Sequence, residues 1–199
     1  MSWQLGRSKL MTTAQTADSE SLRLVASTTT PTRYRVDVIA SSVADVILSA
    51  GGWLFDRAKF GWDVNLLIAE PSDVRSLHIL GLRAVPFDLA CHSAIEWAPN
   101  SALAVAAGVL NTDDRVREIV FTALERGLGE VTLWGDTGST EFHRRTQDVQ
   151  HRLSTAALAF KAHALTAAVL PPGPLTPTEK FRSGTRWCPP YEPDLLPIG

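Results

Sequence analysis

The sequence predicts a three-layer α/β domain of Rossmann-like architecture, with a mainly parallel sheet of about five strands. Strand-like and helix-like patterns alternate from residue 33 to about residue 169 with short connections, which is typical of a parallel sheet covered by helices. The strand-like segments are nearly all apolar, as expected for strands that are covered on both faces. The chain has 199 residues, of which 45% are apolar, enough for one core of ordinary size. A long C-terminal helix and an extended proline-rich tail complete the prediction.

The predicted strands are short apolar runs that contain β-branched residues and are bounded by polar turns. The first run covers residues 34–40 and leads directly into a helix. The other runs cover residues 64–69, 82–87, 102–110 and 130–134, and the pattern at 82–87 is the weakest of them.

Helical spacing of apolar residues predicts the helices that connect these strands. The first helix, at residues 43–58, is interrupted by Gly51 and Gly52, which we attribute to close packing rather than to a hinge. Shorter helices are predicted at residues 71–80 and 114–126. A long amphipathic helix is predicted at residues 141–169. Its apolar stripe consists of Phe142, Val149, Leu153, Ala156, Phe160, Ala164 and Ala167.

Composition divides the chain into three parts. Residues 1–32 are polar and are predicted to be a flexible arm, whereas residues 33–169 form the single α/β domain. Residues 170–199 form a tail that contains eight of the twelve prolines. The tail also keeps large apolar residues, so we expect it to lie extended over the domain or, alternatively, over a partner. Aromatic side chains of such a tail suit partner contacts. The candidates are Phe181, Trp187 and Tyr191.

Charge and composition argue against several classes of protein. The net charge of −2 gives no general attraction to nucleic acid or to an anionic membrane, so neither is expected as a partner. No run of about 18 apolar residues occurs, and no secretory signal is recognised, so no spanning helix is expected. The only cysteines are Cys91 and Cys188, and we expect both to be free thiols in a cytoplasmic protein.

The turn after the first strand has no glycine-rich phosphate loop. Instead, Ser41 and Ser42 precede the helix, and Asp45 lies in its first turn. Ser42 and Asp45 have the spacing of a capping box, in which the serine accepts a backbone N–H and the carboxylate faces the positive end of the helix dipole. Asp73 and the pair Asp113–Asp114 occupy similar positions at two later helix starts. Such carboxylates repel phosphate, so the mouth of the predicted sheet favours cations or basic groups.

Ligands of open α/β sheets bind outside the carboxyl ends of the strands. The loop after the last predicted strand, residues 135–140, offers backbone N–H groups and hydroxyls there, although it lacks the lysine of a P-loop. The alternative for this loop is a plain turn followed by a helix cap. Trp134 is expected to line a pocket next to Asp136. The candidate ligand-binding residues are Ser41, Ser42, Asp113, Asp136, Thr137 and Ser139.

Two functions from different classes are the main hypotheses, and binding of an uncommon nucleotide is a third possibility. The first is a non-catalytic regulatory or protein-interaction domain, which uses its tail and its acidic strand-end mouth to bind another protein or a second copy of itself. It rests on the absence of every strong catalytic motif and of any zinc motif. The alternative is a small magnesium-dependent phosphoesterase or hydrolase, with Glu70, Asp114 and Asp136 as weak catalytic candidates. No cofactor is expected, except magnesium under the alternative.

Overall fold

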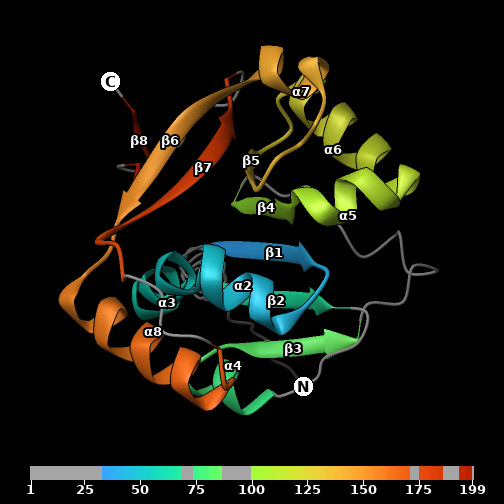
Figure 1. The fold of residues 1–199 in the computed structure, drawn as a ribbon. Helices are drawn as coiled ribbons and strands as arrows, with labels where there is room; N and C mark the ends of the chain where they lie inside the picture. The colour runs from blue at the N-terminus through green and yellow to red at the C-terminus, as the bar shows by residue number, and fades with distance from the viewer. Residues whose placement is uncertain (1–32, 69–73, 87–99, 171–174, 186–192, 199) are drawn as a thin grey trace, which may run out of the picture. The chain divides into compact units, whose positions relative to one another are not determined.

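Eight strands form one mixed sheet in the described part of the chain, in the order β3-β2-β1-β4-β5-β7-β6-β8 (Figure 1). The structure is a computed structural model that describes residues 33–68, 74–86, 100–170, 175–185 and 193–198. Neighbours among β1 to β5 pair in parallel, whereas β6, β7 and β8 pair antiparallel. The α/β class is confirmed, but the prediction of a mainly parallel sheet of about five strands is wrong. The strands are β1 Arg35–Ala40, β2 Asp63–Ile68, β3 Arg83–Pro86, β4 Ser101–Ala106, β5 Glu130–Trp134, β6 Thr146–Arg152, β7 Thr178–Gly184 and β8 Leu196–Pro197.

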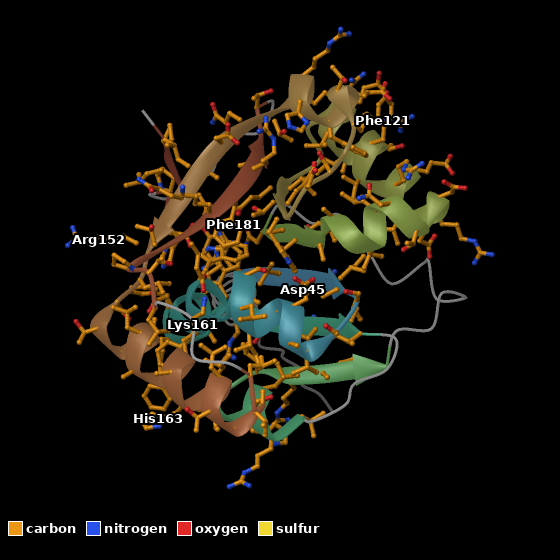
Figure 2. All side chains as sticks on the ribbon, viewed as in Figure 1. Asp45, Phe121, Arg152, Lys161, His163 and Phe181 are labelled. Carbon is orange, nitrogen blue, oxygen red and sulfur yellow. The ribbon has the colours of Figure 1, made fainter. Side chains whose placement is uncertain are left out.

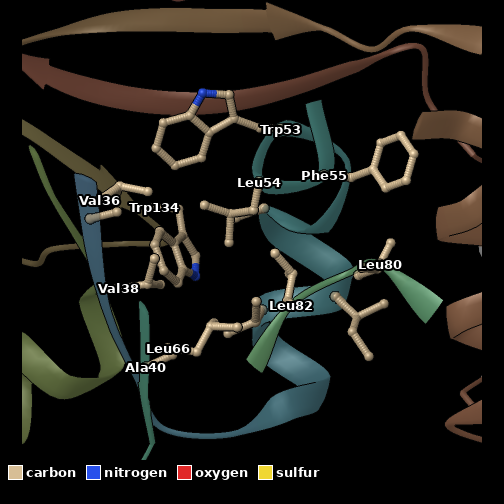
Figure 3. Close-up of a cluster of buried hydrophobic side chains, with 14 of the residues drawn as sticks. Val36, Val38, Ala40, Trp53, Leu54, Phe55, Leu66, Leu80, Leu82 and Trp134 are labelled. Atoms are coloured by element: carbon tan, nitrogen blue, oxygen red, sulfur yellow. The ribbon is translucent and has the colours of Figure 1, made fainter. Parts of the chain in front are cut away.

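Helices cover both faces of the sheet. One buried cluster joins the sheet to α2, α3, α4 and α8, and Figure 3 shows Trp53, Leu54 and Phe55 of α3 within it. The second cluster joins the sheet to α5, α6 and α7. Alternation along β1 sends Val38 to the first cluster and Ile39 to the second. Among the described helices, none is long and apolar enough to cross a membrane. The helices are α2 Val43–Ser49, α3 Gly51–Lys59, α4 Val74–Ile79, α5 Ala107–Thr112, α6 Asp114–Arg126, α7 Thr140–Arg145 and α8 Thr155–Ala167.

The prediction of one long helix at residues 141–169 is wrong. The chain forms the short helix α7, then strand β6, and then helix α8. In the second half of β6, Val149 and His151 are buried, Gln150 between them is half-buried and Arg152 is exposed. This burial pattern follows a strand, because side chains of a strand alternate between the two faces of the sheet.

The described part of the C-terminal segment belongs to the sheet. Strand β7 lies between β5 and β6, so it is an interior strand rather than an extended tail on the surface. Phe181 of β7 is 3% exposed, and its ring centroid lies 4.9 Å from that of Trp53. Trp187 and Tyr191 lie outside the described residues.

Helices α2 and α3 meet at Gly51 and Gly52, where the sequence predicts one interrupted helix. A Cβ atom on Gly52 would lie 2.4 and 2.8 Å from the two Cδ atoms of Leu153, and 3.2 Å from a carboxylate oxygen of Glu179. The glycine therefore permits a close approach between α3 and the segment that joins β6 to α8. This geometry supports close packing as the reason for the interruption.

We expect Gly52→Ala to lower the free energy of unfolding by about 1–3 kcal/mol, because the new methyl group overpacks the contact with Leu153. Chemical denaturation followed by tryptophan fluorescence measures the change. The matched control is Gly108→Ala in α5, where the new Cβ would lie 3.9 Å from Oγ of Ser41 and would clash with nothing. The control should be neutral or stabilising by up to about 1 kcal/mol. Equal stability of the two variants would contradict the prediction.

Candidate functional site

Two neighbouring cavities lie beyond the carboxyl ends of β4 and β5. The first has a volume of about 530 Å³ and lies between α6, α7 and the loop that follows β5. The second has a volume of about 290 Å³ and lies between the same loop and strands β6 and β7. Thr137, in the loop, lines both cavities. The two cavities therefore share one wall, which the loop after β5 supplies.

The shared loop, residues 135–139, is shaped by two glycines and one aspartate. Gly135 and Gly138 have φ angles of 85° and 60°, which side chains other than glycine rarely adopt. Oδ1 of Asp136 accepts the N–H of Gly138 at 2.9 Å, and Nδ2 of Asn111 donates to the backbone oxygen of Asp136 at 3.1 Å. Thr137 is only 2% exposed. The loop is thus held by one hydrogen bond within it and by one from α5.

Carboxylates outnumber cations around the first cavity. Its charged lining consists of Asp114, Glu118 and Glu141 against one guanidinium, that of Arg117, which leaves a net formal charge of −2. Arg117 is already held by Asp114 at 3.2 Å and by the backbone oxygen of Leu110 at 3.0 Å. The first cavity therefore presents a negative field to an incoming group.

Two phenylalanines supply the apolar surface of the first cavity, which also receives a cation from outside its lining. Phe121 of α6 and Phe142 of α7 both line the cavity. The guanidinium carbon of Arg145 lies 4.4 Å from the ring centroid of Phe121 (labelled in Figure 2), and its Nη1 lies 3.7 Å from Oε1 of Glu141. An aromatic face beside a carboxylate suits a cation on an aliphatic stem.

The second cavity has a mixed lining. Trp134 and Asp136 both line it, as the sequence predicts, and Lys180 and Arg182 of β7 bring positive charge. Arg182 pairs with Asp148 at 2.5 Å. Asp148 also lines this cavity, and the remaining lining residues are Leu133, Gly135, Thr137, His143 and Phe181. Compared with the first cavity, positive and negative groups are balanced here.

Several residues that the sequence predicts as ligand-binding are N-caps of helices. Ser42 accepts the N–H of Asp45 at 3.2 Å as the N-cap of α2. Asp113 accepts the N–H groups of Arg115 and Val116 at 2.9 and 3.4 Å as the N-cap of α6. Ser139 accepts the N–H of Glu141 at 3.3 Å as the N-cap of α7 and also lines the first cavity.

The predicted carboxylates are distributed rather than gathered. Asp114 lines the first cavity and Asp136 the second, while Glu70 lies outside the described residues. Asp45 is held by Nε1 of Trp134 and by Oγ of Ser49, each at 3.2 Å. Within the described ranges, no group of three or more His, Cys, Asp or Glu side chains is placed to hold a metal ion.

The sequence contains a signal for the first cavity that the search for strand-end carboxylates missed. Asp114, Arg117, Glu118 and Phe121 recur at positions i, i+3, i+4 and i+7 of α6, which places them on one side of the helix. That stripe lies beside the buried apolar residues of the same helix. It can therefore be recognised from the sequence once a helix is predicted at these residues. Asn111 and Phe142 carry no such signal, because the loop and α7 bring them to the cavity.

No protein-family model matches the chain, and a search of curated proteins finds no match.

Proposed function

We propose that the chain is a non-catalytic protein-interaction domain on a Rossmann-like scaffold, and that its first cavity binds an arginine or lysine side chain of a partner protein or of a second copy. The observation that carries the proposal is the lining of the first cavity, in which three carboxylates and one guanidinium surround two phenylalanine side chains. A partner's cation would meet the carboxylates while its aliphatic stem contacts the aromatic surface. We further infer a cytoplasmic location from the low cysteine content.

The strand order supports the Rossmann-like part of the proposal. In the order β3-β2-β1-β4-β5, the chain starts in the middle of the parallel strands, builds outward to β3 and then returns to the other side of β1. Ligands of such sheets bind beyond the carboxyl ends of the strands. The first cavity meets that expectation, because the loop that follows β5 and the end of α5, which follows β4, both line it.

The contact between Arg145 and Phe121 is an internal example of the binding that we propose, and a partner's cation would replace Arg145 at this ring and at Glu141. The internal contact places a guanidinium 4.4 Å from the ring centroid of Phe121, beside Glu141. An exposed cation–π contact contributes about 0.5–1 kcal/mol, and an exposed ion pair contributes a similar amount. One basic side chain therefore binds weakly, and tight association requires further contacts around the cavity.

An NMR titration with N-acetyl-argininamide tests the proposal, with N-acetyl-citrullinamide as its uncharged isostere. We expect saturable shifts of the backbone amides of residues 111–121 and 137–142 with the arginine compound only, and weaker shifts at high salt. The double variant Glu118→Gln/Glu141→Gln should lose these shifts, because it reduces the charge of the lining. The matched control is Asp63→Asn, a carboxylate with 53% exposure outside both cavities. Equal shifts with both compounds, or no saturable shift, would overturn the proposal.

The alternative proposal is a magnesium-dependent phosphoesterase that uses Glu70, Asp114 and Asp136. A metal ion held by protein carboxylates requires them within about 2.0–2.6 Å of one point. Asp114 and Asp136 line different cavities, and Oδ1 of Asp136 already accepts the N–H of Gly138. The described carboxylates therefore favour binding of a basic group over hydrolysis.

A further inference from the structure

His151 on β6 connects two other segments from a buried position. It is 7% exposed, its Nδ1 lies 2.9 Å from the backbone oxygen of Asp194, and its Nε2 lies 3.0 Å from Oδ2 of Asp56. A carbonyl oxygen and a carboxylate oxygen both accept hydrogen bonds, so each contact requires an N–H group on the imidazole. A neutral imidazole has one N–H group. Both bonds therefore exist together only when His151 is protonated.

Asp56 is held in its ionised form by Ser154. The backbone N–H of Ser154 donates to Oδ2 of Asp56 at 3.0 Å, and its hydroxyl donates to Oδ1 at 2.6 Å. The hydroxyl oxygen also accepts the N–H of Ala157 at 3.0 Å, which makes Ser154 the N-cap of α8. Burial alone would raise the pKa of Asp56, but hydrogen bonds from His151 and Ser154 lower it below its ordinary value. The shared proton therefore resides on His151.

The surroundings of His151 also favour its protonated form. Four carboxylates and two cations come from the elements packed around it, so the site carries a net charge of −2 without the imidazole proton. Burial alone would lower the pKa of His151, but the bonds to Asp56 and to the Asp194 carbonyl, together with the nearby carboxylates, raise it above its ordinary value of 6.5. The charged groups are Asp56 and Arg57 from α3, Glu130 from β5, Glu179 from β7, Lys161 from α8, and Asp194 from the segment before β8.

We propose that His151 acts as a proton-operated latch on residues 193–198, because its protonated ring holds the Asp194 carbonyl against β6 and its deprotonated ring releases it. When one proton leaves, the remaining N–H stays with Asp56, since a hydrogen bond to a carboxylate is stronger than one to a neutral carbonyl. The Asp194 carbonyl then loses its donor.

Within the described residues, the segment 193–198 has these other contacts with β6 and α3. Strand β8 has two residues and pairs only with Val149 and Gln150, and the N–H of Ile198 donates to the backbone oxygen of Asp148 at 3.1 Å. The Asp194 carboxylate adds bonds to Trp53 and Arg57 of α3. Leu195 is also buried in the first core cluster. Segments with few backbone bonds open at low free-energy cost, and among these contacts the bond from His151 is the one that is lost when the imidazole is deprotonated.

The direction of the pH dependence follows from the raised pKa. A histidine whose pKa is higher in the folded protein stabilises the fold fully below its unfolded pKa, which is 6.5, and this stabilisation is lost as pH rises through the folded pKa. The latch is therefore closed on the acidic side of this transition and open on the alkaline side.

Hydrogen exchange and an imidazole titration, both by NMR on the full chain, test the latch. We expect protection of the amides of Asp194, Leu195, Leu196 and Ile198, corrected for intrinsic exchange, to fall along the His151 titration by about tenfold per pH unit above its midpoint. Amides of β1 and β4 should keep their protection over the same range. Protection of 194–198 that stays constant through the His151 titration would overturn the proposal.

The variant His151→Gln removes the titrating group, and we expect low, pH-independent protection of residues 194–198. The matched control is His163→Gln, because His163 is exposed on the outer side of α8 (Figure 2). The control should keep the pH dependence of the original protein. If His163→Gln also loses this pH dependence, the proposal is overturned. If His151→Gln does not fold, the comparison of amide protection with the His151 titration in the original protein is by itself the test of the proposal.

Discussion

Replacing Arg57 by methionine is expected to lower the free energy of unfolding by about 3–5 kcal/mol, the usual effect of removing one partner from a buried ion pair. The Arg57 side chain is 2% exposed and donates to Asp194 at 2.7 and 2.9 Å and to Glu130 at 2.7 Å. Its guanidinium carbon also lies 4.3 Å from the ring centroid of Trp53 and 4.1 Å from that of Trp62. Methionine keeps apolar contact with both rings but removes the positive charge from both carboxylates.

Urea denaturation measures this loss, and the matched control is Arg126→Met, an exposed arginine at the end of α6. The control should change stability by no more than about 0.5 kcal/mol. Burial raises the pKa of Asp194, but Arg57 lowers it below 3.8, so its contribution is lost only as pH falls through the folded pKa. In Arg57→Met this acid loss should begin at higher pH. A variant within about 1 kcal/mol of the original protein would contradict the buried-pair interpretation.

Replacing Lys161 by methionine is the second large effect, and we expect it to destabilise the protein by about 3–5 kcal/mol at neutral pH. Lys161 is the only cation in α8, and it points inward, where its Nζ lies 2.5 Å from Oε1 of Glu179 and 2.7 Å from the backbone oxygen of Leu48 (Figure 2). Burial raises the pKa of Glu179, so its ionised form depends on Lys161 and on the N–H groups of Gly52 and Trp53. The destabilisation should shrink as pH falls and Glu179 becomes neutral.

The double variant Lys161→Met/Glu179→Gln separates charge from packing. The glutamine carbonyl can still accept an N–H from the start of α3, but no charge without its partner remains at this position, so part of the lost stability should return. Lys180→Met is the matched control, because Lys180 is the exposed neighbour of Glu179 on β7. Thermal unfolding across a pH series measures all three variants. A double variant no more stable than Lys161→Met would contradict the role assigned to the charge.

The parallel half of the sheet was predictable because its strands are apolar on both faces. β1, β2 and β5 lie where the apolar runs predict them, within one or two residues. The run at 102–110 is split, since β4 ends at Ala106 and residues 107–112 form α5. Small apolar residues such as alanine fit either state, so this boundary depended on packing that periodicity does not record.

The antiparallel half was missed because several of its buried residues are polar. His151, Glu179 and Lys161 are all less than 10% exposed, and each is satisfied by partners far away in the sequence. A hydropathy pattern assigns such residues to the surface, so β6 was predicted as part of a helix and β7 as part of a tail. Long-range ion pairs satisfy the buried polar residues of these strands, and a single sequence does not reveal those pairs.

The candidate site was predicted in part. The loop at residues 135–140 does line both cavities, and Trp134 lies beside Asp136 in the second. The sequence left open whether the strand-end carboxylates converge. Among the described residues they do not, because Asp113 and Asp136 bind N–H groups of their own turns. Such residues readily form hydrogen bonds with backbone N–H groups nearby in the chain. Their positions in the sequence therefore predicted more ligand-binding residues than the structure brings together.

The position of β7 has a consequence for the order in which the protein is made. β7 lies between β5 and β6 but follows both in the chain, so β6 leaves the ribosome before its main partner exists. The parallel strands can assemble before residues 178–184 are synthesised. Until then, the edges of β5 and β6 that later pair with β7 stay unpaired. Synthesis that stalls after α8 would therefore leave two strands with edges open to pairing with other nascent chains.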